Sequence, residues 1–369
     1  MIETIAIISG AVFLILHIIF YIGYLRSSGL KQFEEITPPP TVSVIVAARN
    51  EEKVIRACID SLKKLKYTSG KLEIILVNDQ STDRTSEIMI TETSGISRFK
   101  IINTGDYSES VIKGKPRALD IAIKQSGGDY ILMTDADCTV NENWAEETVK
   151  YFTRKTGMVC GFTKILSANS LFAKLQSIDW IYLQSLAVCS CGIKLPLSCI
   201  GNNLSVRKGA YFSVGGYEKI KFSVTEDLAL MRDINKGKNF DVIYPVNAEC
   251  LVVTAECGSI KELYNQKKRW FRGGTGINYL GFILGTELYI LNLIFLTGLF
   301  YLSPIVYFSV VLMKMVSELL IIIPVYRRLR YKGLLKYYLL FEFYFAVYGL
   351  LLPLSFITGK SINWKDRRH

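Results

Sequence analysis

Histidine is nearly absent from this chain. Only His17 and His369 occur among its 369 residues, one near each end. Acid–base catalysis by histidine is therefore excluded from any site in the central part of the chain, which leaves carboxylates as the available bases. The eight cysteines form no C-x-x-C pair. A zinc site built on Cys189, Cys191 and Cys199 is disfavoured because no histidine lies near. If the central part of the chain is cytoplasmic, its cysteines should be reduced thiols, mostly in the core.

Two glycine-rich phosphate-binding motifs are also missing. No G-x-G-x-x-G follows the first predicted strand and no G-x-x-x-x-G-K-[ST] occurs, which argues against a dinucleotide dehydrogenase and a P-loop nucleotidase. The formal net charge of +11 is spread over many segments without a nucleic-acid-binding motif. We therefore expect no nucleic-acid partner and attribute the charge to attraction by the anionic headgroups of a lipid bilayer.

Long apolar runs are what the chain has in excess. Half of its residues are hydrophobic and 21% are charged, and the apolar residues gather at both ends. Thr4–Leu25 is an uncharged run long enough to cross a membrane as a helix. Glu3 before it and the lack of a cleavage site after it indicate a retained anchor. Basic residues beside the apolar runs predict a multi-pass protein of the cell membrane with its central region in the cytoplasm.

This pattern divides the chain into five predicted parts. They are an N-terminal transmembrane anchor at 1–26, a proline-rich linker at 27–40, a folded domain at 41–276, about three C-terminal transmembrane helices at 277–358 and a basic tail at 359–369. Three C-terminal spans would export the basic tail, against the positive-inside rule. Either the tail is an exception, or the segment interrupted by Gly349 and Pro353 enters and leaves the membrane on one side.

The folded domain alternates short β-branched runs with helical patterns. Such alternation predicts an α/β fold built on a doubly wound, mostly parallel sheet. The predicted strands are Thr41–Ala47, Leu72–Val77, Phe99–Asn103 and Tyr130–Thr134, and the predicted helices include 51–66 and 118–125. Leu171–Leu186 is also helical and rich in large apolar residues. It fits either a core helix or an amphipathic helix on the membrane surface.

Carboxylates follow these strands at the edge where parallel sheets bind ligands. Asp135 and Asp137 come directly after one strand, Asp79 after another and Glu51 shortly after the first. Two carboxylates two residues apart suit Mg²⁺ or Mn²⁺ bound jointly with substrate phosphates. A helix cap or turn is the alternative role of Asp79. Lys115, in a Gly-Lys-Pro-Arg segment, is a further group suited to neutralising phosphates.

Two later helical segments carry further polar candidates. Asp227 begins a predicted helix at 227–234, where the helix dipole also favours acidic residues. Gln266 and Arg269 are three residues apart on one helix face, and Trp270 follows them. A basic juxtamembrane helix with an interfacial tryptophan is the alternative interpretation of that segment.

Together these pieces resemble the membrane-bound glycosyltransferases of family 2, the group that contains hyaluronan, chitin, cellulose and poly-N-acetylglucosamine synthases and ceramide glucosyltransferases. The resemblance spans 41–270 and the flanking apolar segments. Its six motifs, in the family's order, are Val46–Glu51 (VAARNE), Val77–Asp83 (VNDQSTD), Gly114–Leu119 (GKPRAL), Asp135–Asp137 (DAD), Thr225–Asp227 (TED) and Gln266–Trp270 (QKKRW). The resemblance implies a GT-A-type fold in the cytoplasm, flanked by transmembrane helices.

The resemblance also implies a role for each candidate residue. Asp227 would be the catalytic base, and Asp137 would hold Mn²⁺ or Mg²⁺ on the diphosphate of the donor. The substrate-binding residues that the motifs predict are Glu51, Asp79, Lys115, Asp135, Asn202, Asn203, Gln266, Arg269 and Trp270. Among these, the two asparagines belong to a loop near the donor sugar whose sequence departs from the family's usual small-residue pattern.

The implied activity is transfer of a hexose from a nucleotide-sugar donor, UDP by the resemblance, to a membrane lipid or glycan. In-line displacement of the diphosphate, with a carboxylate as base, inverts the anomeric carbon and gives a β-linked product from an α-linked donor. Three alternatives stay open. They are a processive polysaccharide synthase whose channel an oligomer or accessory subunit would complete, a catalytically silent membrane scaffold, and a nucleotidyltransferase, which would leave Gln266–Trp270 unexplained.

Overall fold

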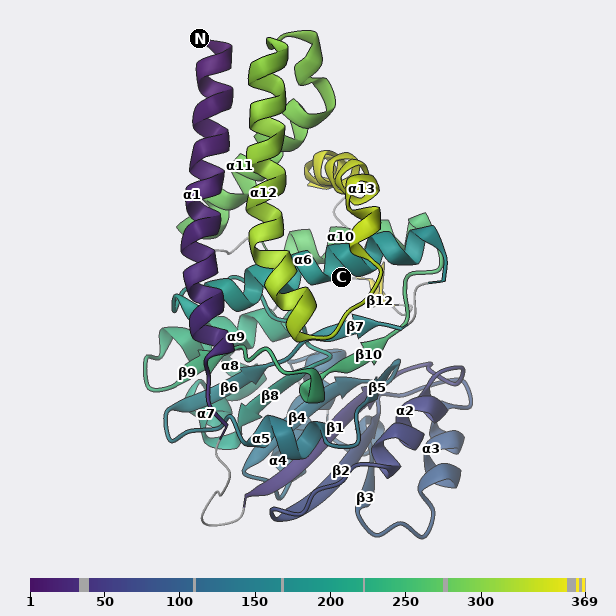
Figure 1. Cartoon of the computed structure of the whole chain (residues 1–369). Coiled ribbons are helices and arrows are strands. Elements are labelled where there is room, and N and C mark those ends of the chain that lie inside the picture. The colour runs from purple at the N-terminus through teal and green to yellow at the C-terminus, as the bar shows by residue number, and fades with distance from the viewer. Residues whose placement is uncertain are drawn as a thin grey trace.

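The computed structural model of the chain describes residues 1–32, 40–108, 111–166, 169–221, 223–274, 278–356, 363–364 and 367–368. Residues 33–39 of the predicted linker and most of the predicted tail at 359–369 lie outside this description. Figure 1 shows an α/β domain with long helices standing on it, and the N-terminus lies at the far end of these helices.

A seven-stranded sheet forms the centre of the domain, in the order β3-β2-β1-β4-β8-β6-β9. Its strands are β1 (Thr41–Ala48), β2 (Lys71–Asn78), β3 (Phe99–Asn103), β4 (Tyr130–Asp135), β6 (Thr156–Cys160), β8 (Leu204–Arg207) and β9 (Asp241–Ile243). Strands β3, β2, β1 and β4 pair in parallel, β8 is antiparallel to both neighbours, and β9 is parallel to β6. The predicted α/β fold with a mostly parallel sheet is confirmed.

The residues of β1 explain why this sheet is covered on both faces. Val42, Val44 and Val46 are buried in one apolar cluster, and Ile45 is buried in the other. Such β-branched side chains fit a pleated strand with a core on each side. All eight cysteines are free and buried, in agreement with the prediction of reduced thiols in a core.

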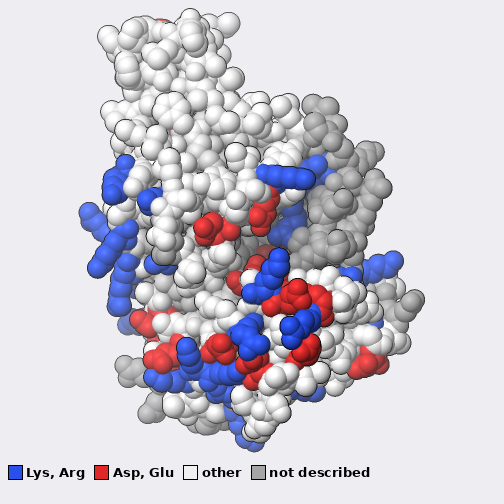
Figure 2. Space-filling model, turned by 90° about the vertical axis from the view of Figure 1, so that its right-hand side faces the viewer, with Lys and Arg blue, Asp and Glu red and all other residues white. Residues whose placement is uncertain are grey.

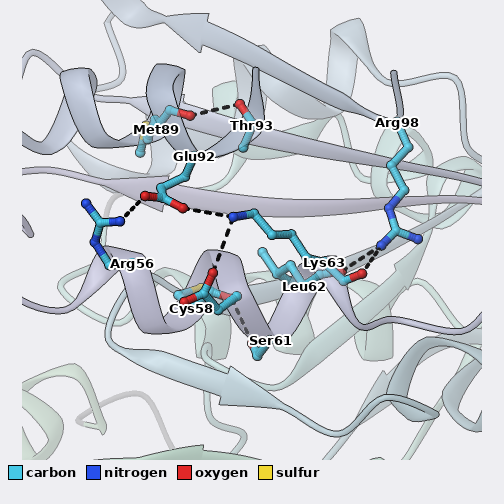
Figure 3. A network of polar contacts seen from close by, with 10 residues as sticks. Arg56, Cys58, Ser61, Leu62, Lys63, Met89, Glu92, Thr93 and Arg98 are labelled. Atoms are coloured by element: carbon cyan, nitrogen blue, oxygen red, sulfur yellow. Dashed lines mark hydrogen bonds and ion pairs between the residues drawn. The ribbon is translucent and has the colours of Figure 1, made fainter. Parts of the chain in front are cut away.

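In the described part of the domain, nine helices pack around the two sheets. They are α2 (Ile55–Lys63), α3 (Thr85–Thr93), α4 (Lys115–Gln125), α5 (Trp144–Val149), α6 (Leu171–Gly192), α7 (Lys208–Ser213), α8 (Gly216–Lys219), α9 (Glu226–Lys236) and α10 (Ile260–Gly273). The Glu92 carboxylate joins α2 to α3 by accepting from Arg56 and from Lys63 Nζ, the latter at 2.9 Å (Figure 3). Arg98 satisfies the carbonyls at the end of α2.

A second, three-stranded sheet begins directly after the acid pair at the end of β4. Its strands are β5 (Cys138–Val140), β10 (Val252–Thr254) and β7 (Thr163–Ile165), in that order. β10 is antiparallel to β5 and parallel to β7. Figure 1 shows this sheet between the large sheet and the long helices. It therefore connects the end of β4 to the side of the domain that faces those helices.

Among the described residues, four helices are long and apolar enough to cross a membrane. Two of these spans are α1 (Ile2–Ser28) and α12 (Pro304–Arg328). The other two include α11 (Tyr279–Thr297) and α13 (Tyr338–Leu351) together with short flanking turns. The outer ends of α1 and α12 meet where the Ser303 N–H donates to the Glu3 carboxylate at 2.8 Å. Their inner ends reach the domain, where Arg328 Nε donates to the Val246 carbonyl at 2.8 Å.

The α13 helix differs in direction from α1 and α12. Figure 1 shows it nearly end-on, while α1 and α12 run up the picture. Just before α13, Tyr337 accepts a hydrogen bond from Lys174 of α6 at 3.3 Å, and near its end the Tyr348 hydroxyl donates to Asp179 of α6 at 2.5 Å. Both ends of this segment therefore lie against the same domain helix, and α13 runs across the bundle.

The α6 helix lies between the domain and the long helices. It packs against β7 on one side and against α1, α12 and α13 on the other, and most of its residues are buried. Gly23 of α1 permits very close backbone contact, because a Cβ there would lie 2.0 Å from the Cys189 carbonyl oxygen. The structure therefore supports the core-helix interpretation of this segment.

Candidate active site

The loops that follow β1, β2 and β4 meet at one edge of the large sheet. Figure 2 shows acidic and basic side chains around a hollow between the uncharged upper part of the molecule and the charged domain. Parallel strands place their carboxyl ends side by side, so polar residues far apart in the sequence share this edge. The predicted site residues on the first three loops are therefore neighbours along the sheet.

The loops after β1 and β2 hold each other in place. Asn50 and Gln80 have positive φ angles of 53° and 56°, a backbone conformation that is uncommon outside glycine. Asn50 Oδ1 accepts from the Thr82 N–H at 2.9 Å, and Arg49 Nη1 donates to the Asp79 carbonyl at 2.9 Å. The predicted substrate-binding residue Glu51 is anchored through its N–H, which donates to Thr85 Oγ1 at 2.8 Å.

Asp79 and Asp135 lie on opposite sides of β1. The Asp79 N–H donates to the Ala48 carbonyl at 2.9 Å, and Asp135 is in register with Ala47. The Asp79 side chain is buried, and its Oδ1 accepts from Thr104 Oγ1 at 3.0 Å. The structure thus brings both carboxylates to the same sheet edge, where the predicted nucleotide would bind.

Lys115 links the acid pair to the start of α9. It begins α4 directly after Gly114, whose φ is 70°, and its Nζ lies 2.5 Å from Asp135 Oδ1 and 3.3 Å from Glu226 Oε1. Burial acts to lower the pKa of Lys115, but the two carboxylates raise it above the usual lysine value. The lysine therefore stays charged and holds the two acidic segments together.

Asp137 carries the less compensated charge of the acid pair. Burial raises the pKa of Asp137, and the neighbouring Asp135 carboxylate raises it further. Its Oδ1 accepts a weak hydrogen bond from the Cys138 thiol at 3.2 Å. A buried carboxylate beside a second carboxylate is a hard-oxygen ligand suited to a divalent cation.

No group of three or more His, Cys, Asp or Glu residues that could hold a metal ion by itself occurs in the described part of the chain. This composition fits Mn²⁺ or Mg²⁺ held in the manner of a nucleotide-dependent site. Such ions use one or two carboxylates and take their remaining ligands from phosphates and water. Asp137 would supply the carboxylate, so the donor set of this chain is compatible with a cation shared with the substrate.

Asp227 lies in the first turn of α9, close to the loop at 199–203. Burial raises the pKa of Asp227 to about 6, and the adjacent Glu226 adds to that shift. Lys115 and Arg269 act in the opposite direction. A Cβ on Gly201 would lie 3.0 Å from Asp227 Oδ2, so glycine lets that loop close over the carboxylate.

The α10 helix brings the last predicted motif beside α9. A Cβ on Gly273 would lie 2.3 Å from Thr225 Oγ1, which shows how closely the two helices approach. Gln266 Oε1 is buried and has no hydrogen-bond partner among the described residues. The Trp270 ring contacts the ring of Trp180 at a centroid distance of 5.5 Å. A ligand that donates a hydrogen bond at this position would satisfy the buried acceptor.

The two asparagines of the 199–203 loop are already engaged in the fold. Asn203 Oδ1 accepts from Trp144 Nε1 at 3.1 Å, and its Nδ2 donates to the Phe162 and Cys250 carbonyls at 2.7 and 2.9 Å. Asn202 Oδ1 accepts from Thr163 Oγ1 at 2.6 Å. These contacts give the asparagines a positioning role, and their contact with substrate stays a prediction.

Sequence reasoning missed three features of this site. Glu226 was part of the Thr-Glu-Asp motif, so its pairing with Lys115 had a signal in the sequence. Gly201 had none, because only the fold shows that its missing side chain makes room for Asp227. The buried pair of Lys267 with Asp179 also had none, since the sequence places Lys267 in a run of basic residues that reads as exposed.

Two models of one protein family match this chain. A model described as glycosyl transferase family 2 matches residues 43–213, and a model described as glycosyl transferase family group 2 matches residues 130–356. The second match covers more than half of the chain. The first match includes the loops after β1, β2 and β4, and the second includes α9 and α10, so the family that the motifs predict is confirmed.

Curated relatives match over a large part of the chain. The beta-monoglucosyldiacylglycerol synthase of Nostoc sp. is 29% identical over 242 residues, which are 64% of this chain and 49% of the relative. The poly-beta-1,6-N-acetyl-D-glucosamine synthase of Staphylococcus epidermidis is 27% identical over 235 residues, 63% of this chain and 54% of the relative. The chain thus spans about half the length of the curated relatives it matches.

A solved structure extends the likeness over nearly the whole chain. The mannosyltransferase PcManGT from Pyrobaculum calidifontis, in complex with GDP-Man and Mn²⁺, superposes with a TM-score of 0.59 at 16% identity, covering 95% of this chain and 99% of that chain. At this identity the likeness concerns the fold alone. It supports the GT-A-type fold that the resemblance predicts.

Proposed function

The chain belongs to glycosyltransferase family 2, and we propose that it moves one sugar from a UDP-sugar to a membrane lipid, with inversion of the anomeric carbon. Two observations on the site carry this proposal. Burial and neighbouring carboxylates raise the pKa values of Asp137 and Asp227. In addition, Gln266 Oε1 is buried and has no hydrogen-bond partner among the described residues. A site with surplus negative charge and an unused acceptor is built to be completed by a cation and a polar substrate.

The leaving diphosphate is the first charge that the reaction must stabilise. Asp137 is the residue that would hold Mn²⁺ or Mg²⁺ against the diphosphate. When bound, the cation supplies Lewis-acid stabilisation of the departing phosphate oxygens. Arg269 adds positive charge from α10, since its charge already acts on Asp227 in the free protein. Asp79 and Asp135 face the nucleotide from two strand ends and fix its orientation.

Proton removal from the acceptor hydroxyl is assigned to Asp227. Its pKa of about 6 leaves the carboxylate ionised in most molecules at neutral pH while keeping it basic enough to accept a proton. A base on the side of the sugar opposite the diphosphate requires in-line attack. The expected product is therefore β-linked when the donor is α-linked.

A lipid acceptor follows from the surroundings of α10. Lys267 on this helix forms a buried ion pair with Asp179, and its Nζ lies 5.3 Å from the centre of the Tyr348 ring of α13. Helix α10 is therefore attached to an apolar helix on the side away from the sheet, and an acceptor can approach from the bilayer. The Nostoc relative, named as a synthase of a glucosylated diacylglycerol, is consistent with this assignment.

The second candidate is a processive polysaccharide synthase, which the name of the Staphylococcus epidermidis relative favours. Against it stands the packing of the long helices. Phe13, Phe20 and Phe341 are fully buried among them, so large side chains fill the described bundle where a polymer would need a channel. An oligomer or accessory subunit would have to provide that channel.

For the membrane arrangement we propose that α1, α11 and α12 cross the bilayer and that α13 lies against the domain. This follows from the contacts of both ends of the α13 segment with α6. Arg327 and Arg328 end α12 at the domain, and the positive-inside rule then assigns the domain to the cytoplasm. The basic tail stays on the same side, which removes the conflict that three C-terminal spans would create.

The decisive experiment is a donor and acceptor screen with the full chain in membranes. Labelled UDP-sugars are incubated with Mn²⁺ and a membrane-lipid extract, and products are identified by mass spectrometry. One sugar per lipid is the expected product. A ladder of sugars would favour the processive synthase, and failure of UDP to bind with Mn²⁺ in calorimetry would favour the silent scaffold.

Asp137→Asn is the matching test of the metal assignment. We expect UDP binding in the presence of Mn²⁺ to be weakened at least about tenfold, because metal ligands and their supports typically contribute on this scale. The control is Asp60→Asn, an exposed carboxylate of α2 that pairs only weakly with Lys63 at 3.3 Å. Equal binding by both variants would remove Asp137 from the metal site.

A further inference from the structure

A basic pocket lies where α12 turns toward α13. It has a volume of about 400 Å³ and is bounded by the α12–α13 loop, the first turns of α6 and the end of β7. Five of its lining residues are basic, and none is acidic: Lys164, Lys174, Arg330, Lys332 and Lys336. Basic side chains gather at this level on the left of Figure 2. None of the candidate active-site residues lines this pocket.

Three of the five cations lie over tyrosine rings, Lys336 among them with its Nζ 5.2 Å from the centre of the Tyr337 ring. Lys164 Nζ lies 5.0 Å from the centre of the Tyr331 ring, and Lys174 Nζ lies 4.9 Å from that of Tyr337. Among the described residues, one carboxylate forms an ion pair with the five, that of Glu249 at 3.8 Å from Arg330, and both side chains are exposed. Such a surface pair contributes little, so the positive charge of the pocket is left for an anion.

Arg330 is held in a conformation that its backbone alone would not favour. It has a φ of 58° and occupies the left-handed position of a Schellman motif. The Arg330 N–H donates to the Arg327 carbonyl at 3.1 Å and the Tyr331 N–H donates to the Tyr326 carbonyl at 3.0 Å. Glycine is the usual residue at this position because it adopts positive φ without strain. Replacing Arg330 with glycine would therefore relieve the backbone at this position.

We propose that this pocket binds the phosphate headgroup of an anionic membrane lipid. The pocket adjoins the end of α12 and the start of the α13 segment, two apolar helices, so lipid headgroups lie within its reach. Clustered basic residues beside membrane helices are suited to anionic headgroups. Tyr331 and Tyr337 add the amphipathic rings that favour the interface between water and lipid. The proposal concerns a site apart from the sugar-transfer chemistry and holds whatever sugar is transferred.

The test uses Arg330→Gly and a matched control in the full chain, purified in neutral detergent. The glycine removes the charge and relieves the positive φ, so the variant keeps the fold, which thermal unfolding verifies. Lys238→Gly is the control, because Lys238 is also an exposed basic residue with a positive φ, 56°, and lies outside the pocket. Binding of dioctanoyl phosphatidylglycerol is measured by calorimetry.

We expect Arg330→Gly to weaken phosphatidylglycerol binding about fivefold, the effect of one basic group at an anionic lipid surface. Lys332→Gln with Lys336→Gln should weaken it further, and Lys238→Gly should leave it unchanged. Dioctanoyl phosphatidylcholine and inorganic phosphate should bind at least tenfold more weakly than phosphatidylglycerol. Equal affinity for phosphatidylcholine, equal affinity for free phosphate, or an unchanged affinity in the pocket variants would overturn the proposal.

Discussion

The molecule places a lysine between two carboxylates in two separate regions. In the candidate active site, Lys115 Nζ lies 2.5 Å from Asp135 and 3.3 Å from Glu226. In the bundle, Lys314 of α12 pairs with Glu342 of α13 and lies 2.8 Å from Glu318. The charged groups are the same in kind and number, and the surroundings decide what each cluster does.

The bundle cluster is closed and the site cluster is open. The side chains of Lys314 and its two partners are 0–1% exposed, and the Tyr338 hydroxyl donates to Glu318 at 2.8 Å. In the site, the Lys115 side chain is 17% exposed and that of Asp135 is 33% exposed. The carboxylates of Asp137 and Asp227 lie near these two groups. A closed cluster links helices, whereas an open one with surplus acid receives a ligand.

The largest expected effect is a loss of turnover, without a loss of stability, when Asp227 beside the open cluster is replaced. Asp227→Asn keeps the shape of the side chain and removes the base. We expect turnover to fall about 10²- to 10⁴-fold, the usual contribution of a general base, while UDP binding and the unfolding temperature stay near those of the parent protein. Assays of transfer with saturating donor measure this loss.

Asp233→Asn is the control for that variant. Asp233 lies on the same helix and forms a surface pair with Lys236 at 3.6 Å, so its replacement should leave turnover unchanged. Turnover of Asp227→Asn within twofold of the control would assign the proton transfer to another group.

The closed cluster should respond in stability and not in catalysis. Lys314→Met leaves Glu318 and Glu342 facing each other without their cation. Removing one partner from a buried ion cluster costs about 3–5 kcal/mol, so thermal unfolding in detergent should occur at a clearly lower temperature. The fraction that remains folded should keep its turnover per molecule.

A triple variant distinguishes an ion cluster from simple side-chain volume. Lys314→Met combined with Glu318→Gln and Glu342→Gln removes every formal charge, and we expect most of the lost stability to return because replacing a whole buried cluster is often neutral. If the triple variant unfolds as early as Lys314→Met alone, the loss comes from packing.

A smaller effect is expected from pH, again in the open cluster. Asp227 accepts a proton only when ionised, and burial raises its pKa to about 6. As pH falls below that value, the protonated fraction of Asp227 grows. The decrease in turnover should then approach about tenfold for each further pH unit. A kcat profile between pH 5 and 8 measures this limb, and a flat profile would contradict the assignment of Asp227 as base.

The parallel part of the sheet could be predicted from the sequence, because its strands are apolar runs bounded by polar residues. The run at Thr41–Ala47 became β1 with one residue added, and Phe99–Asn103 became β3 unchanged. The helix predicted at 51–66 is shorter, Ile55–Lys63, because the Glu51 carbonyl accepts from Val54 and Ile55 in a preceding turn. Strands of three residues such as β5 and β9 are too short to give a periodic pattern.

The part of the candidate site that lies at strand ends could be predicted from the sequence. Asp79, Asp135 and Asp137 were grouped because parallel strands bring their carboxyl ends together, and the structure places them so. The contact of Gly201 with Asp227 required the fold, because it joins distant segments. The direction of α13 also required the fold, since a run of apolar residues has the same hydropathy whether it crosses the membrane or lies over α6.

The apolar core that begins under β1 continues without a break into the long helices. Ile45 of the sheet, Tyr182 of α6 and Phe341 of α13 belong to one buried cluster. The catalytic half is therefore not a detachable module. A fragment cut at the predicted domain boundary would expose the upper face of α6 to water, and its expression as a soluble protein would require a redesigned surface there.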